Sequence, residues 1–184
     1  RHLSTQQLLL RCEQGLGNWD EVARLVQLLA KRNALMPEAA DSLLVSARIA
    51  RIEQLANDIE KLRRFWQALP SEAQVGRVAI AAARVFTELL DFTTVRQIVE
   101  AAIPHGWDEA LVRLYGQCPD SEALARIEQA ELWLNQRPRD ATLLAVLGQL
   151  CTQRELWGKA SQYLEASLAV QSSRKAHVAL ALLY

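Results

Sequence analysis

A cysteine followed directly by a proline, Cys118-Pro119, is the pair in this sequence that could bind a cofactor. A Cys-Pro pair can offer a thiolate to the iron of haem, with the proline directing the chain away from the metal. The same pair is also typical of a helix end, because proline cannot continue a helix. Both interpretations of Cys118 stay open, and we expect no other cofactor.

The other residues with metal or acid–base chemistry do not form a recognisable site. His2, His105 and His177 are far apart, and none has a cysteine or carboxylate at ligand spacing on the same expected helix. The three cysteines include no Cys-x-x-Cys pair, so neither a zinc site nor a disulfide framework is encoded. Phosphate-binding glycine loops and the His-Glu-x-x-His and Gly-x-Ser-x-Gly motifs are also missing. We therefore expect no catalytic residue, no metal and no enzyme activity.

Charge argues against nucleic acid as a partner. The 184 residues include 21 Lys plus Arg and 21 Asp plus Glu, which gives a formal net charge of zero. Nucleic-acid binding needs clustered positive charge, and an anionic membrane surface needs a basic run; the sequence has neither. The carboxylates have arginines nearby, as Glu60 has Arg63 and Glu128 has Arg126, which indicates solvated helix faces. Apolar runs such as Val78 to Ala83 are far shorter than the about 20 residues that span a membrane.

Apolar residues recur at helical spacing along the chain. Val22, Leu25, Val26 and Leu29 share one helix face, and residues 144–151 and 160–168 repeat this pattern. Breakers fall between such segments at Gly17, Pro37, Pro70, Pro104, Pro119 and Pro138. Their spacing fits pairs of helices of roughly 12 to 15 residues, and no segment alternates as a strand would. The pattern predicts an all-α fold.

Three turns share one design, which indicates an internal repeat. In residues 17–22, 90–95 and 155–160 a turn is followed by an aromatic residue and then by the apolar start of a helix. The clearest helix pair, residues 141–174, resembles a tetratricopeptide unit, in which a small residue of the first helix lets the second helix approach. Gly148 and Ala160 are the expected close contact.

We therefore predict a single domain, residues 1–184, that is a right-handed α-solenoid of antiparallel helix pairs. It would have about five degenerate tetratricopeptide units and a truncated last helix, which leaves Val178, Ala181 and Leu182 exposed or covered by something else. The tryptophans Trp19, Trp66, Trp107, Trp133 and Trp157 are expected to fill gaps between the pairs, with a ligand cage as the alternative. A closed helical bundle with accidental similarity among its turns is the alternative fold.

A partner-binding surface follows if the first helices of the pairs line the concave face. The outward residues in the pair before Pro104 are Arg77, Ile80, Arg84 and Glu88, and in the pair that begins near Ala141 they are Thr142, Gln149 and Gln153. Such a polar and cationic surface suits an acidic or extended segment of another protein, because arginine pairs bidentately with carboxylates. An ordinary solvated face is the alternative.

Several strings resemble one family when they are taken in order. They are Gly17-Asn18-Trp19-Asp20-Glu21-Val22, Leu29-Ala30-Lys31-Arg32, Leu62-Arg63-Arg64-Phe65-Trp66, Gly106-Trp107-Asp108, Leu111-Val112-Arg113-Leu114-Tyr115-Gly116, and Leu147-Gly148-Gln149-Leu150-Cys151 running into Leu156-Trp157-Gly158-Lys159-Ala160. Along nearly the whole chain, their order is similar to the carboxy-terminal half of the HemY family. These are bacterial inner-membrane tetratricopeptide proteins associated with late haem and porphyrin synthesis. The stretch around Cys118-Pro119 departs from the repeat pattern.

The resemblance implies a domain on the cytoplasmic side of the bacterial inner membrane, held there by an upstream anchor that this fragment lacks. The only methionine is Met36 and the chain opens at Arg1, which fits a piece of a longer protein. The domain would scaffold or regulate haem-pathway enzymes or handle their product, and the family has no catalytic residues to carry over. The rival hypotheses are a general tetratricopeptide adaptor in envelope assembly or chaperoning, and a haem or porphyrin carrier that uses Cys118 or a histidine.

Overall fold

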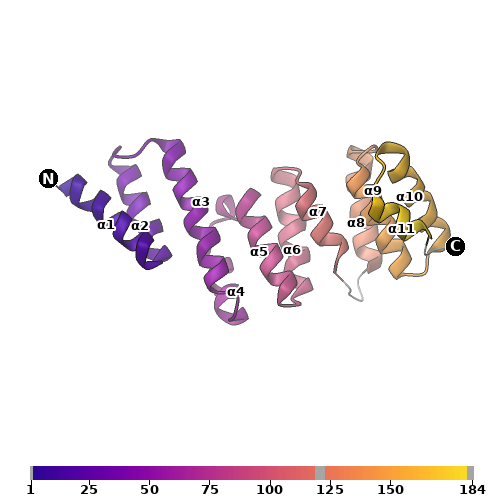
Figure 1. Ribbon diagram of the computed structural model, residues 1–184, viewed down its shortest axis with the longest axis horizontal. Helices are drawn as coiled ribbons and strands as arrows, with labels where there is room; N and C mark the ends of the chain where they lie inside the picture. Colours follow the sequence, from indigo (N-terminus) through magenta and orange to yellow (C-terminus); the bar gives the residue numbers. More distant parts are fainter. Residues whose placement is uncertain (1, 119–122, 182–184) are drawn as a thin grey trace. The chain divides into compact units, whose positions relative to one another are not determined.

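The computed structural model describes residues 2–118 and 123–181, and this part of the chain is all-α (Figure 1). It contains eleven α-helices and two short 3-10 helices, and no strand occurs in these ranges. The chain divides into two compact units, residues 1–89 and residues 90–184. Whether the two units form the single domain predicted from the sequence depends on how they are placed relative to each other. The single domain therefore stays a prediction. Within the described ranges, every helix is too short or too polar to cross a bilayer.

Five α-helices form the first unit: α1 (His2–Leu16), α2 (Trp19–Lys31), α3 (Pro37–Gln54), α4 (Ile59–Ala68) and α5 (Gly76–Glu88), with the 3-10 helix η1 (Ser71–Ala73) before α5. Helix α2 packs against α1 and α3, and α3 packs against α5. The face of α2 predicted from its periodicity is buried, with Val22, Leu25, Val26 and Leu29 in one core cluster with Ala40 of α3. Burial of this apolar stripe stabilises the helix far more than its intrinsic propensity does.

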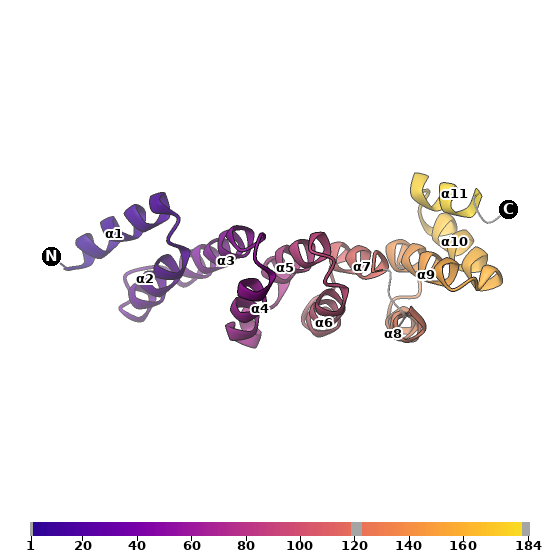
Figure 2. The same cartoon turned by 90° about the horizontal axis from the view of Figure 1, so that it is seen from below.

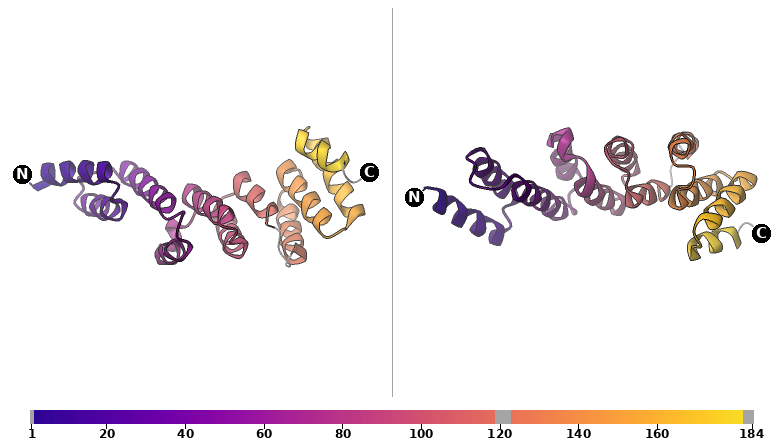
Figure 3. Two further views of the ribbon diagram at one scale, coloured as in Figure 1. Left: turned by 60° about the horizontal axis from the view of Figure 1, so that its bottom comes forward. Right: turned by 90° about the horizontal axis from the view of Figure 1, so that it is seen from above.

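Six α-helices form the second unit: α6 (Phe92–Ala102), α7 (Glu109–Gly116), α8 (Ala123–Gln136), α9 (Ala141–Gln153), α10 (Trp157–Val170) and α11 (Arg174–Ala181), with the 3-10 helix η2 (Ile103–His105) after α6. Helix α9 is central, because it packs against α7, α8 and α10, and α11 packs against α10. In Figure 2, α6 and α8 lie on one side of α7 and α9, and α10 and α11 lie on the other; the right-hand view of Figure 3 shows the same division.

The three similar turns share a backbone conformation. As predicted, an aromatic residue begins α2, α6 and α10. Two positions earlier, φ lies in the left-handed region each time, at 72° for Gly17, 60° for Leu90 and 58° for Glu155. This region costs a residue with a side chain roughly 1–2 kcal/mol. Its recurrence at Leu90 and Glu155 therefore indicates a turn geometry that the surrounding packing imposes.

Hydrogen bonds close two of these turns in the same way. The amide of Asn18 donates to the carbonyl of Glu13 at 3.0 Å, and the amide of Leu156 donates to the carbonyl of Cys151 at 2.9 Å. Each bond spans five residues, as in the Schellman ending of a helix, and its acceptor is a carbonyl in the last turn of the helix.

A glutamine–glycine hydrogen bond recurs in both units. Gln54, the last residue of α3, donates from Nε2 to the carbonyl of Gly17 at 2.9 Å, and Gln153, the last residue of α9, donates from Nε2 to the carbonyl of Gly116 at 3.4 Å. The two partners are 37 residues apart in each case. We call this bond the glutamine brace. It ties the end of one helix to the end of the helix two elements earlier.

The close contact predicted at Gly148 is confirmed. A Cβ atom at this position would lie 2.6 Å from Cγ of Leu164 and 3.4 Å from the carbonyl oxygen of Ala160. Both neighbours belong to α10, so the two helices can approach this closely only because Gly148 has no side chain.

The prediction that Arg126 lies with Glu128 on a solvated helix face is wrong. The side chain of Arg126 is completely buried. It donates to the carbonyl of Tyr115 at 2.8 Å and to the carbonyl of Cys118, and its guanidinium lies 5.9 Å from the centre of the Tyr115 ring. The arginine thus pairs one carbonyl in the last turn of α7 and one just after that helix. It ties α8 to the end of α7 through Tyr115 and Cys118.

The tryptophans follow the prediction only in part. Trp66 and Trp133 are buried, Trp19 and Trp107 are half-buried, and Trp157 is 53% exposed. The expectation is wrong for Trp157. This residue is the first of α10, and the buried residues of that helix begin one turn later, at Ala160.

Replacing Gly148 by valine should lower the free energy of unfolding by about 1–3 kcal/mol, because the added methyl groups overpack the α9–α10 contact. Urea denaturation followed by circular dichroism measures this. Gly158→Val is the matched control, since nothing lies within 4 Å of a Cβ atom there. Equal stabilities of the two variants would contradict the close contact.

Replacing Arg126 by methionine should lower the free energy of unfolding by about 2–4 kcal/mol, because it removes the buried guanidinium that donates to the carbonyls of Tyr115 and Cys118. The exposed Arg139→Met should stay within about 0.5 kcal/mol of the parent chain. The same denaturation measurement compares them, and a neutral Arg126→Met would show that water replaces the guanidinium.

Candidate functional site

A groove of about 970 Å³ is the candidate binding site, and all its walls belong to the second unit. Helix α9 forms one wall and α11 forms another, with contributions from the end of α7 and from α10. The wall on α9 consists of Ala141, Thr142, Ala145, Val146, Gln149, Thr152 and Gln153. The remaining lining residues are Arg113, Gln117, Leu164, Ser167, Gln171, Ser172, Ser173, Arg174, Ala176, Val178 and Ala179.

The division of α9 into two faces positions this wall. Its leucines Leu143, Leu144, Leu147 and Leu150 are buried, whereas Gln149 and Gln153 are exposed and Thr142 and Ala145 are half-buried. Small and polar side chains are thus left on the face toward the groove. Helix α11 meets α10 through the buried Ala176, while Val178 stays 53% exposed and lines the groove. Ala181 is also exposed, and Leu182 lies outside the described residues.

Three of the predicted partner-binding residues come together in this groove, namely Thr142, Gln149 and Gln153. The other four, Arg77, Ile80, Arg84 and Glu88, lie on α5 in the first unit. There the two arginines and Glu88 are exposed and Ile80 is half-buried. A single concave face that includes both groups depends on how the two units join, so it stays a prediction.

Charge in the groove is positive. Among the described residues that line it, two are arginines and none has a carboxylate. Arg113 donates to Oε2 of Glu109 at 2.6 Å, and the same carboxylate atom accepts from the hydroxyl of Thr142 at 3.1 Å, so the charge of Arg113 is already balanced. Arg174 is exposed and has no ion pair with the described residues.

The sequence prediction missed the far wall of the groove. Gln117, Gln171 and Arg174 lie outside the two helices from which the concave face was predicted. The predicted last helix, with its exposed Val178, could have indicated a second wall. Periodicity does not show, however, on which side of α10 that helix packs.

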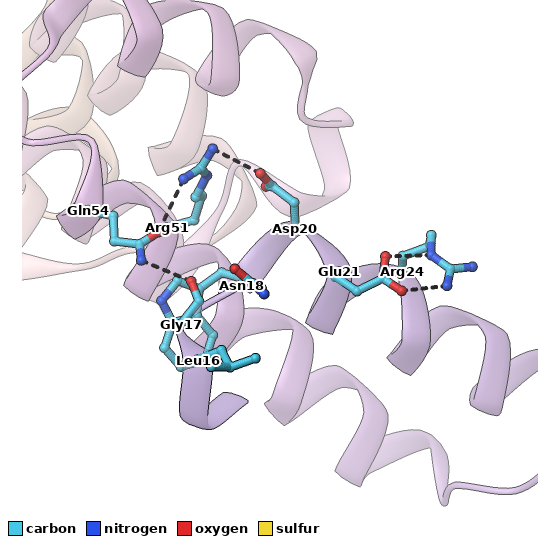
Figure 4. Close-up of a pocket in the computed structure, with 9 residues that line it drawn as sticks. Leu16, Gly17, Asn18, Asp20, Glu21, Arg24, Arg51 and Gln54 are labelled. Atoms are coloured by element: carbon cyan, nitrogen blue, oxygen red, sulfur yellow. Dashed lines mark hydrogen bonds and ion pairs between the residues drawn. The ribbon is translucent and has the colours of Figure 1, made fainter. Parts of the chain in front are cut away.

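A second hollow, of about 560 Å³, lies in the first unit (Figure 4). Its polar groups largely pair with one another: Arg51 contacts Asp20 at 2.9 Å and Gln54 at 3.1 Å, and Arg24 contacts Glu21 through two bonds. Gln54 is occupied by the glutamine brace. With these partners already made, the second hollow offers a ligand fewer free polar groups than the groove does.

Cys118 is buried, and its thiol donates to the carbonyl of Leu114 at 3.5 Å. Its own carbonyl accepts from Arg126. These contacts favour the interpretation of a helix end over that of a haem ligand; Pro119 lies outside the described residues.

The histidines remain apart where the structure describes them. His105 lies exposed in η2, and His177 of α11 lies 3.4 Å from the hydroxyl of Ser172. No group of three potential metal-binding side chains occurs in residues 2–118 and 123–181.

The cysteines should differ strongly in their reactivity toward iodoacetamide. Cys12 is exposed, whereas Cys118 and Cys151 are buried, and burial raises the pKa of the Cys151 thiol to about 11. The thiolate is the reactive form, so near pH 8 we expect rapid alkylation of Cys12 alone. Mass spectrometry of timed samples measures this, with the chain unfolded in urea as the control. Alkylation of Cys118 as fast as that of Cys12 would contradict its burial and reopen the interpretation of Cys118 as a haem ligand.

Comparisons with protein-family models, with curated proteins and with solved structures found no match to this chain. The similarity to the HemY family therefore stays a resemblance of short strings. The interpretation of the groove rests on its geometry and chemistry.

Proposed function

We propose that this chain is a non-enzymatic scaffold that binds other proteins, and that the groove of the second unit is its binding site. The observation that carries the proposal is that Thr142, Gln149 and Gln153 line one open groove with the uncompensated Arg174 on another wall. Protein-binding surfaces on helical repeats are made in this way, by residues that the packing of neighbouring helices leaves outward.

Part of the proposal is that the helices belong to a right-handed solenoid of about five degenerate tetratricopeptide units, with α11 as the first helix of a further unit. The shared turns before α2, α6 and α10 support it, as does the glutamine brace, whose partners have the same separation in both units. Gly17 and Gly116, the two acceptors, are separated by close to three units of about 34 residues.

We further propose that the partners are enzymes of late haem synthesis, and that an anchor upstream of this chain holds it at the cytoplasmic side of the bacterial inner membrane. This part rests on the resemblance to the HemY family. The haem-carrier hypothesis receives less support, because Cys118 is engaged in the structure of the helix end. An adaptor role in envelope assembly or chaperoning would use the same groove with other partners.

Site-specific cross-linking in the native host tests the proposal. A photoreactive residue at Gln149, inside the groove, should cross-link to enzymes of haem synthesis, which mass spectrometry identifies. The matched control is Gln162 on α10, which is exposed but lies outside the groove and should give no such product.

Two results would reject parts of the proposal. Recovery of envelope-assembly proteins or chaperone clients from Gln149, without any haem-pathway enzyme, would replace the haem pathway by the adaptor role. Equal cross-linking from Gln149 and Gln162 would reject the groove as the binding site.

A further inference from the structure

We propose that the groove binds an extended peptide segment that carries carboxylates, with Gln149 hydrogen-bonding to the peptide backbone and Arg174 pairing with a carboxylate. This inference rests on the proposed function, and it names the chemistry of the segment that the groove would bind. Three features of the groove lead to it: its free amide groups, its charge and the size of its side chains.

The amide groups favour an extended backbone. Gln117, Gln149 and Gln171 are exposed on the groove, and their side chains make no hydrogen bond with the described residues. Each amide offers both donors and an acceptor. A helical ligand pairs most of its own backbone groups, whereas an extended segment presents N–H and C=O groups that need partners. The free amides of the groove can therefore pair with the backbone groups that an extended segment leaves without partners.

The charge selects an acidic segment. Arg174 on the α11 side has no ion pair with the described residues, and no carboxylate lines the groove there to repel an anion. A guanidinium binds a carboxylate through two parallel hydrogen bonds, which gives direction as well as attraction. A lysine-rich segment would meet Arg174 with a like charge.

The small side chains leave room for the peptide. Ala141 and Ala145 lie on α9, and Ala179 lies on α11. Successive side chains of an extended segment point to opposite faces, so every second side chain can enter the space between these alanines. The exposed Val178 offers an apolar contact to such a side chain.

Binding of three labelled octapeptides to the purified chain tests the inference by fluorescence anisotropy. One alternates valine with glutamate, one alternates valine with glutamine, and one alternates valine with lysine. The glutamate peptide should bind at least about tenfold more tightly than the other two, because its charge-assisted bonds exceed neutral ones in strength. N-methylation of a central backbone amide of the glutamate peptide should weaken binding about fivefold through the loss of a hydrogen bond.

Variants of the chain assign the binding to the two proposed residues. Arg174→Glu should weaken binding of the glutamate peptide about tenfold or more, and Gln149→Ala should weaken it about fivefold. Arg154→Glu is the matched control, because Arg154 is exposed but lies outside the groove, and it should change the affinity less than about twofold. Circular dichroism verifies that all variants are folded.

The inference is overturned if the lysine peptide binds as tightly as the glutamate peptide, if Arg174→Glu and Arg154→Glu have equal effects, or if no peptide binds below about 1 mM. None of these results decides the scaffold function, which the cross-linking from Gln149 tests. Cross-linking of a haem-pathway enzyme from Gln149 together with absent peptide binding would reject the acidic peptide and keep the scaffold. Peptide binding without such a cross-link would keep the peptide site and reject the haem-pathway partner.

Discussion

Helices α9 and α10 lie as close together as they do because position 148 has no side chain. A Cβ atom there would lie 2.6 Å from Leu164, closer than two packed carbon atoms can approach. Since α9 also packs against α7 and α8, and α10 carries α11, this one contact positions both walls of the groove. The absence of a side chain at one residue thus affects the distance between groove side chains that come from distant parts of the sequence.

The periodicity of apolar residues was sufficient to predict an all-α chain and the buried faces of α2 and α9. Val22, Leu25, Val26 and Leu29 on α2 and Leu144, Leu147 and Leu150 on α9 are buried as their spacing predicts, because a helix can satisfy its backbone by itself and needs only a face to bury. The aromatic starts of α2, α6 and α10 could be predicted for a similar reason. Their signal is local.

What the sequence could not predict depends on contacts between distant segments. The left-handed backbone at Leu90 and Glu155 has no signal in those residue types, since neither is glycine or asparagine. Arg126 lies at helical spacing from Ala123, Ile127, Ala130 and Trp133, all of them buried, yet an arginine at a core position is credible only when carbonyls to pair with it are known. The far wall of the groove needs the side on which α11 packs, which no periodic pattern contains.

The glutamine brace connects the fold to the groove, because Gln153 belongs to both. Its Nε2 donates to Gly116 at 3.4 Å, a longer and weaker bond than the 2.9 Å bond of Gln54 to Gly17 in the first unit. A ligand backbone that reached Gln153 would therefore displace a weak internal bond at little cost. Arg126 meanwhile holds the end of α7 through the carbonyls of Tyr115 and Cys118, so Gly116 and the groove residue Gln117 lie between two fixed points. In the binding that we propose, Gln153 would exchange its hydrogen bond to Gly116 for one to the ligand while Arg126 keeps the end of α7 in place.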